Sequence, residues 1–152
     1  MNKIAVFPGS FNPITLGHVE IVKRALPLFD KLIIGIGVNS QKKYYFSLEQ
    51  RIQWINETFK DDPKIEVKSY DYLTVDFCKE NNARYLVRGL RNVTDFDYEK
   101  TISQLNAVIG DGLETVFFIC SPDHSLISSS VVREIIKGGG DASHFLPEAV
   151  KV

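Results

Sequence analysis

The sequence predicts an α/β fold in which residues 1–152 form a single domain around a five-stranded parallel sheet with helices on both faces. Five short runs rich in Val, Ile and aromatic residues alternate with longer stretches whose apolar residues recur at helical spacing. Such alternation is typical of parallel sheets, because parallel strands need a long crossover that is usually a helix. A chain of 152 residues, 44% of them hydrophobic, is long enough to bury one substantial core.

The expected strands are short, and turn residues follow each of them. Right-handed crossovers leave few arrangements and favour a doubly wound, Rossmann-like sheet with strand order 3-2-1-4-5. In that order strands 1 and 4 are neighbours where the winding reverses, and ligands bind outside the carboxyl ends of the strands at such points. We therefore expect the loops of residues 8–18 and 88–94 to meet in a ligand-binding crevice. The expected strands are residues 4–7, 32–38, 65–70, 85–87 and 115–119.

Apolar spacing and capping residues predict the helices between these strands. The first follows the opening loop, and Pro27 should kink or shorten it because proline has no N–H to donate. Ser47 should begin the second helix, with Gln50 completing a capping box, and Thr74 should cap the third. The fourth is expected over residues 94–108.

The last part of the chain contains residues that end helices. The fifth helix is expected to start near Ser128 and to end at the three glycines of residues 138–140, a strong helix-end pattern. Pro147 then permits only a short final helical turn.

Charge and composition exclude several classes of protein. The net charge is −1 and the pI is near 6.3, which argues against a general nucleic-acid coat and against a binder of anionic membranes. No apolar run approaches the roughly 20 residues of a membrane span, and the N-terminus has no signal-peptide pattern. Cys78 and Cys120 are far apart and indicate reduced core thiols. We expect a cytoplasmic protein.

The loop that follows the first strand is the strongest functional signal. Gly9 allows the backbone to approach a ligand closely, Ser10 offers a hydroxyl, and Gly17 lies where the next helix begins. Thr15 and His18 are three residues apart and share a face of that helix start. A lone histidine is more often a surface residue, but the whole loop at this position favours phosphate binding.

Two further motifs suit phosphate. Arg88 and Arg91 follow the fourth strand, where planar guanidinium groups can clamp an anion, although solvated surface arginines are an equally good explanation of this pattern alone. Residues 128–130 are three serines that open a helix, and they exceed the single serine that N-capping needs.

Three more side chains have two explanations each. Lys42, with its neighbour Lys43, belongs either to a solvated basic turn or to the phosphate site as a point charge. Asp95 and Glu99 either face the crevice or are solvated helix residues.

Other catalytic templates are missing from the sequence. It contains no Walker-type phosphate loop and no GxSxG nucleophile elbow, and Gly35 and Gly37 lie inside an expected strand, not after one. Ser121, Asp123 and His124 are too close together to form a triad, and no carboxylate cluster predicts a dedicated metal cage.

The motifs together resemble a known family. Residues 15–18, TLGH, are similar to the [HT]xGH signature of the nucleotidyltransferase superfamily. The segments PGSFNPITLGH, RGLRNVTDFDYE and ISSSVVRE, with the late segment around residues 140–147, resemble the bacterial phosphopantetheine adenylyltransferases over essentially the whole chain. This resemblance implies transfer of the adenylyl group of ATP to 4′-phosphopantetheine, giving dephospho-coenzyme A and pyrophosphate. It also implies a homohexamer and feedback by coenzyme A.

The resemblance also implies roles for individual residues. Catalysis would rest on His18, Lys42, Arg88 and Arg91. The phosphopantetheine site would comprise Ser10, Lys42, Leu73, Thr74, Arg88 and Asn106. The ATP site would comprise Ser10, Phe11, His18, Gly89, Leu90, Arg91, Glu99, His124, Ser125, Leu126, Ile127, Ser128, Ser129 and Ser130. Mg²⁺ would accompany the ATP phosphates without protein ligands of its own.

Two alternatives remain open. A sister nucleotidyltransferase would act on another phosphate, such as nicotinamide mononucleotide with ATP or glycerol 3-phosphate with CTP, but the RGLR and ISSS forms resemble the adenylyltransferases more closely. A nucleotide-sensing module without catalysis would not need His18, Lys42 and both loop arginines. An attacking phosphate needs no general base, so we expect direct in-line displacement without a covalent enzyme intermediate.

Overall fold

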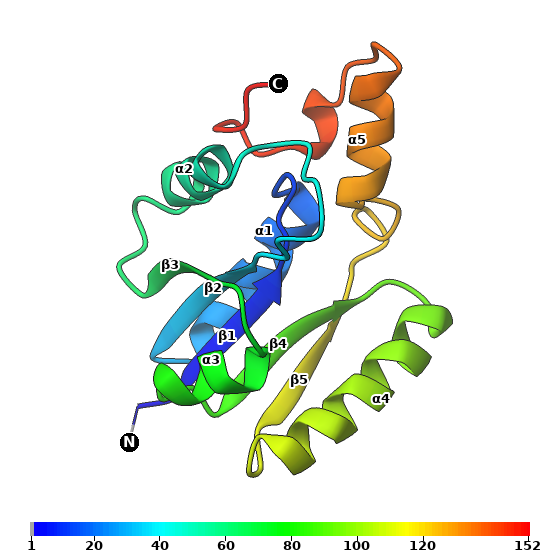
Figure 1. Cartoon of the computed structure of the whole chain (residues 1–152). Coiled ribbons are helices and arrows are strands. Elements are labelled where there is room, and N and C mark those ends of the chain that lie inside the picture. Colours follow the sequence, from blue (N-terminus) through cyan, green and yellow to red (C-terminus); the bar gives the residue numbers. More distant parts are fainter. Residues whose placement is uncertain (1) are drawn as a thin grey trace.

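The computed structural model describes residues 2–152, in which five strands alternate with five α-helices (Figure 1). The strands are β1 (Ile4–Gly9), β2 (Lys31–Gly37), β3 (Ile65–Tyr70), β4 (Tyr85–Leu90) and β5 (Glu114–Ile119). The helices are α1 (Leu16–Ala25), α2 (Leu48–Thr58), α3 (Thr74–Glu80), α4 (Val93–Ile109) and α5 (Ser129–Lys137), with 3₁₀ turns η1 (Leu26–Leu28) and η2 (Ser143–Phe145). No helix within the described range has the length and apolar character needed to cross a membrane.

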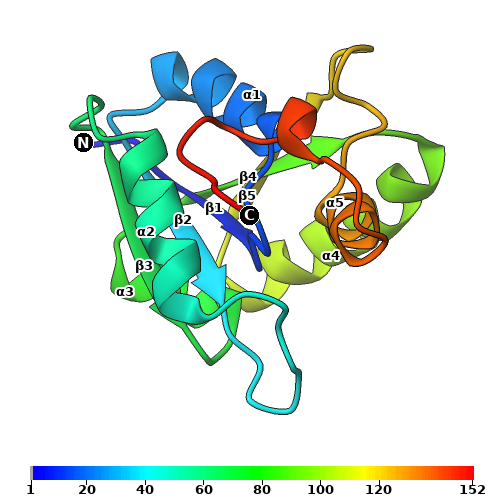
Figure 2. The same cartoon turned by 90° about the horizontal axis from the view of Figure 1, so that it is seen from above.

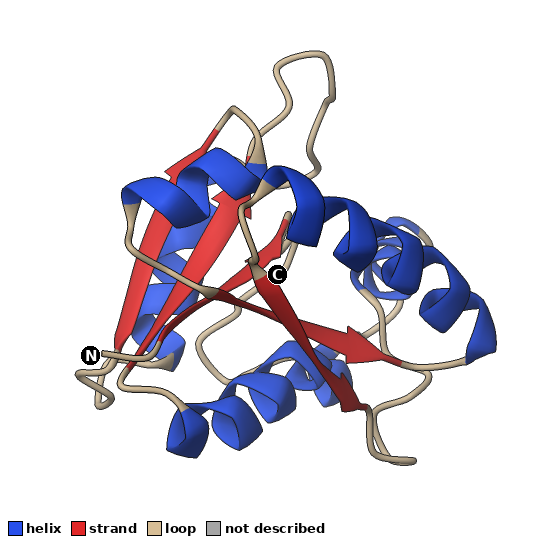
Figure 3. Cartoon of the chain, turned by 90° about the horizontal axis from the view of Figure 1, so that it is seen from below, coloured by secondary structure: helices blue, strands red, loops and turns tan. Residues whose placement is uncertain are grey.

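The sheet has the predicted architecture. All neighbouring strands are parallel and their order is β3-β2-β1-β4-β5, which confirms the predicted 3-2-1-4-5 arrangement. Helices cover both faces, as Figure 3 shows with helices in blue and strands in red. β1 pairs with β2 along its whole length, but it pairs with β4 only at Ala5–Tyr85 and Val6–Leu86. The two central strands therefore separate toward their carboxyl ends, where a ligand can enter.

Alternation along the central strands divides the core into two parts. Ala5 and Phe7 belong to a large cluster with α1, α2 and α5, while Val6 belongs to a smaller cluster with α3 on the other face. Successive side chains of a strand point to opposite faces, so neighbouring residues of β1 serve different layers. Each layer fixes its helices against the sheet and thereby places the loops at the carboxyl edge.

Most helix boundaries follow from local chemistry. α1 ends at Ala25 and continues as a 3₁₀ turn that contains Pro27, which confirms the predicted shortening. The Ser47 side chain accepts a hydrogen bond from the Gln50 N–H, so half of the predicted capping box forms. The prediction that Thr74 caps α3 is wrong. Leu73 occupies the N-cap position without a side-chain cap, and the Thr74 hydroxyl lies 2.9 Å from the Tyr70 hydroxyl instead.

Gly35 in β2 is required by packing. The rings of Tyr70 and Phe77 stack 4.2 Å apart beside it, and a β-carbon at this position would lie 2.9 Å from the Phe77 ring. That distance is shorter than real contacts allow, so a methyl group would force the aromatic pair to move. Gly37, two residues later, is a useful contrast because its nearest neighbour would be 3.5 Å away, an ordinary contact.

We predict that Gly35→Ala lowers the free energy of unfolding by about 1–3 kcal/mol, as expected for overpacking a filled core. The matched variant Gly37→Ala should change it by less than about 0.5 kcal/mol, in the range of substitutions without a packing conflict. Urea unfolding followed by circular dichroism measures both. Equal effects in the two variants would contradict the packing explanation.

Candidate functional site

Two depressions open beside the separated ends of β1 and β4. The first, which we call the His18 depression, has a volume of about 290 Å³ and the second, the Thr74 depression, about 340 Å³. Pro8, Gly9 and Arg88 line both of them. A ligand group bound to Arg88 would therefore contact ligands in both depressions. This shared wall lies at the switch point where the sequence predicts a ligand.

The His18 depression collects most of the residues that the resemblance assigns to ATP. They come from the loop after β1, the start of α1, the end of β4 and the loop before α5. The predicted residues that line it are Ser10, Phe11, His18, Gly89, Arg91, His124, Ile127, Ser128 and Ser129. Five other predicted residues do not line it: Leu90 is buried, Leu126 and Ser130 are exposed, Ser125 points its hydroxyl at the Pro122 carbonyl, and Glu99 lines the Thr74 depression.

His18 is held by the N-terminus of α1. Its backbone N–H donates to the Thr15 hydroxyl, and its ring Nδ1 accepts from the Thr15 N–H at 2.9 Å, which completes a reciprocal capping box. The second bond requires that Nδ1 carry no proton, so the neutral ring has its proton on Nε2. Burial, with the positive charges of Arg88 and Arg91, lowers the pKa of His18 from 6.5 to about 4. His18 is therefore a neutral hydrogen-bond donor at pH 7.

The three serines at α5 differ in their bonds. Ser128 is the N-cap and accepts from the Val131 N–H, while the Ser129 hydroxyl donates to the Pro13 carbonyl at 2.8 Å. The Ser130 hydroxyl accepts from Arg133. Because these hydroxyls already bind protein atoms, the free backbone N–H groups of the first helical turn are the better donors for an anion. The sequence had suggested the hydroxyls as well.

Arg88 is fixed by two partners. Its guanidinium makes a two-pronged ion pair with the Glu99 carboxylate and donates to the Pro8 carbonyl at 2.7 Å. Glu99 is buried on α4, so it faces the crevice and is not a solvated helix residue. Arginine has five N–H donors, and three are used here, which leaves two for a ligand. Glu99 lines the Thr74 depression and not the His18 depression, although the resemblance assigned it to ATP.

Arg91 is also paired, at the more exposed end of the crevice. Its side chain and its backbone N–H both donate to the Asp95 carboxylate, at 3.2 and 2.9 Å. Asp95 therefore orients the second arginine of the RGLR motif.

The Thr74 depression is long and mostly uncharged. It follows α4 from Glu99 to Ile109, a span of about 15 Å at 1.5 Å per residue. The residues assigned by resemblance to the phosphopantetheine arm line it: Leu73, Thr74, Arg88 and Asn106. Its lining suits an elongated ligand with a phosphate near Arg88 and a neutral arm.

Lys42 lies outside both of these depressions. It lies in the loop between β2 and α2, which projects from the molecule in the view from above (Figure 2, cyan). There it lines a third depression with Ser10, Lys43, Arg133 and Lys137. Ser10 also lines the His18 depression, so the two hollows adjoin at that residue.

Arg51 and Asn12 shape the first loop, a role that the sequence did not predict for either residue. Arg51 is almost completely buried, and it donates to the carbonyls of Ser10 and Phe46 while its guanidinium lies 4.3 Å from the Tyr44 ring centre. The Asn12 side chain accepts from the Phe46 N–H at 3.0 Å. No sequence pattern signals a buried arginine that binds carbonyl groups without a carboxylate partner.

His124 is oriented by a carboxylate from α1. Its Nδ1 lies 2.8 Å from Glu20, which also accepts from the Ser121 hydroxyl. The His124 bond is one cause of the lowered pKa of Glu20. Glu20 was missed because nothing in the sequence shows that α1 packs beside the loop before α5.

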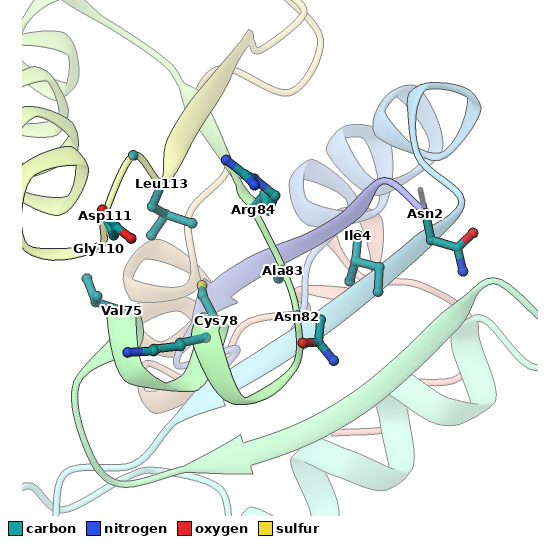
Figure 4. Close-up of a pocket in the computed structure, with 12 residues that line it drawn as sticks. Asn2, Ile4, Val75, Cys78, Asn82, Ala83, Arg84, Gly110, Asp111 and Leu113 are labelled. Carbon is teal, nitrogen blue, oxygen red and sulfur yellow. The ribbon is translucent and has the colours of Figure 1, made fainter.

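A larger cavity of about 590 Å³ lies at the opposite edge of the sheet (Figure 4). Val75, Cys78, Ala83 and Leu113 line it together with residues near the amino ends of the strands. Burial raises the pKa of the Cys78 thiol to about 12, so this cysteine is inert, as expected for a core thiol. The cavity contains none of the predicted site residues, and we call it the rear cavity.

Comparisons with known proteins agree on one family. The family model described as cytidylyltransferase-like matches residues 6–135. A Flavobacterium psychrophilum protein named phosphopantetheine adenylyltransferase is 53% identical over 148 residues, 97% of each chain. A Cytophaga hutchinsonii protein of the same name is 54% identical over 97% of this chain and 98% of its own. One from Bacteroides thetaiotaomicron is 44% identical over 97% of each.

Solved structures share the fold. A bifunctional NMN adenylyltransferase/ADP ribose pyrophosphatase from Francisella tularensis superposes with a TM-score of 0.75 over 99% of this chain, at 18% identity. The same protein complexed with AMP and a manganese ion gives a TM-score of 0.71. This chain spans less than half of that longer protein, 46% and 45% in the two structures. At this identity the likeness shows a common fold alone.

The depressed pKa of His18 gives a test of its environment. Between pH 6.5 and about 4 the unfolded chain protonates His18 while the folded protein does not, so the unfolded state binds more protons and stability falls as the pH drops. We predict that the melting temperature of the protein falls more steeply from pH 7 to 5 than that of His18→Ala. His144→Ala, at an exposed histidine, should keep the steep slope. Identical slopes in all three would contradict the buried neutral ring.

Proposed function

Because the chain belongs to the phosphopantetheine adenylyltransferase family, we propose that it transfers the adenylyl group of ATP to 4′-phosphopantetheine. The products are dephospho-coenzyme A and pyrophosphate, a step of coenzyme A biosynthesis. The observation that carries the proposal is the wall of Pro8, Gly9 and Arg88 shared by the His18 and Thr74 depressions. Two substrates bound in adjoining hollows would meet there with their phosphates.

The proposed reaction is a single in-line displacement. A phosphate oxygen of 4′-phosphopantetheine attacks the α-phosphorus of ATP, a new P–O bond forms, and the bond to the bridging oxygen breaks as pyrophosphate leaves. The attacking oxygen is already anionic, so no general base and no covalent enzyme intermediate are needed. Catalysis then consists of positioning and of stabilising charge on the transferred group.

The donors around the His18 depression suit that task. His18 offers a neutral Nε2–H, Arg91 a guanidinium, and the start of α5 its free backbone N–H groups. These donors are held before any substrate arrives, and preorganised donors lower the barrier without a cost of reorganisation. Arg88 would bind the acceptor phosphate with its two remaining N–H groups. Lys42 lines the third depression, which adjoins the His18 depression at Ser10, and would reach the same phosphate from there.

The remaining expectations are part of the same proposal. Mg²⁺ would arrive as part of the ATP substrate. The His18 depression is lined by no carboxylate, and magnesium commonly keeps its waters and binds through substrate phosphates. We also propose a cytoplasmic homohexamer with feedback by coenzyme A, as the resemblance implies. The exposed apolar side chains of α4, such as Leu105 and Val108, support association of several copies.

We predict that the purified protein releases pyrophosphate from ATP only when 4′-phosphopantetheine is present. A coupled pyrophosphate assay with a panel of acceptors and nucleotides tests this, with nicotinamide mononucleotide and glycerol 3-phosphate as rival acceptors and CTP as rival nucleotide. Turnover with a rival pair and none with 4′-phosphopantetheine and ATP would exclude the proposal. Nucleotide binding without any turnover would favour a sensing module.

We predict that His18→Ala lowers kcat by about 10²-fold or more, as for the loss of one donor to a developing charge. Circular dichroism should show that the variant folds, because Thr15 still caps α1. His144→Ala is the matched control and should keep full activity. If His18→Ala turns over at a near-normal rate, the proposed role of this ring is wrong.

A further inference from the structure

One buried polar atom has no hydrogen-bond partner. The Thr115 hydroxyl oxygen of β5 is the single buried side-chain nitrogen or oxygen in residues 2–152 that lacks a hydrogen bond. Leaving a buried hydroxyl unpaired costs free energy, and native proteins rarely do so without a reason. A ligand that supplies the missing hydrogen bond is one such reason.

Thr115 lines the Thr74 depression below Arg88. In the sheet Thr115 is paired with Leu86, while Arg88 is paired with Phe117, so Thr115 lies two residues, or about 7 Å, farther from the carboxyl edge. Ile102, Asn106 and Ile109 of α4 line the same depression. The unpaired hydroxyl thus lies in a mostly apolar stretch, where a hydrogen bond is stronger than in water.

The Thr74 depression adjoins the rear cavity at Val75. Val75 of α3 lines both the Thr74 depression and the rear cavity, and Figure 4 shows it at the edge of the rear cavity beside Gly110 and Leu113. Its side chain is buried, and a β-carbon on Gly110 would lie 3.2 Å from the Val75 Cγ1. An arm that starts at Arg88 and follows α4 toward Ile109 would therefore pass the part of the depression that contains Thr115.

We propose that the Thr115 hydroxyl binds an amide group of the acceptor arm. The inference rests on the proposed function, because the arm of 4′-phosphopantetheine carries two amides between its phosphate and its thiol. A hydroxyl can donate to an amide carbonyl or accept from an amide N–H. The Thr74 hydroxyl in the same depression is already bonded to Tyr70, whereas the Thr115 hydroxyl is free to serve the ligand.

Thr115→Val tests the inference because valine has nearly the same shape and lacks the hydroxyl. The dissociation constant for 4′-phosphopantetheine, measured by calorimetry, and its KM should rise roughly fivefold, the effect of one neutral hydrogen bond. The KM for ATP and kcat should stay within about twofold of their original values, and the melting temperature should be equal or higher, because an unpaired buried group has been removed.

Two controls separate ligand binding from a structural role. Thr115→Ser keeps the hydroxyl and should restore most of the acceptor affinity, while Thr101→Val makes the same change on the exposed side of α4 and should alter nothing. An unchanged acceptor affinity in Thr115→Val would overturn the inference, as would a lower melting temperature with equal losses for both substrates. If the unaltered protein does not use 4′-phosphopantetheine at all, the proposed function fails and this inference fails with it.

Discussion

The ion pair between Arg88 and Glu99 is the interaction on which the site depends. Arg88 lies near the carboxyl end of β4, Glu99 lies on α4, and the same guanidinium binds the Pro8 carbonyl near the end of β1, so one side chain joins three elements at the switch point. A buried ion pair contributes little net stability, because desolvation offsets the attraction. Its effect here is geometric. It holds the arginine at the wall between two depressions while the central strands separate above it.

The separation of β1 and β4 explains why the opening loop needs so many side-chain anchors. Beyond Val6 and Leu86 the two strands no longer pair, so β1 has sheet partners only on its β2 side there, and the loop that follows β1 has none from β4. Hydrogen bonds from side chains hold this loop in place of strand pairing. Arg51 binds the Ser10 carbonyl, Arg133 binds the Asn12 carbonyl and Ser129 binds the Pro13 carbonyl. An irregular loop held at three carbonyls stays in place without secondary structure, and its glycine and serine remain open to a ligand.

How far the sequence predicts this structure depends on whether the cause is local. Strand order, the shortened α1 and the Ser128 cap follow from periodicity, handedness and proline chemistry, which act within a few residues or by general rule. The cap of α3 was predicted wrongly because Leu73 takes the N-cap position and the Thr74 hydroxyl bonds to Tyr70, at the end of β3, instead of to the helix backbone. Arg51, Glu20 and the unpaired hydroxyl of Thr115 were not found, because their roles arise from contacts between distant segments.

The proposed binding of anionic substrates by a chain whose net charge is −1 depends on how the charges of the site are arranged. Arg88 and Arg91 each have a carboxylate partner, so the positive charge of each arginine is balanced within the protein. His18 stays neutral because burial, and after it the positive charges of Arg88 and Arg91, lower the pKa of its ring. Phosphates would therefore be met by the unused N–H groups of the paired arginines, the histidine Nε2–H and the start of α5. Such a site would attract anions by the direction of its donors more than by an excess of positive charge.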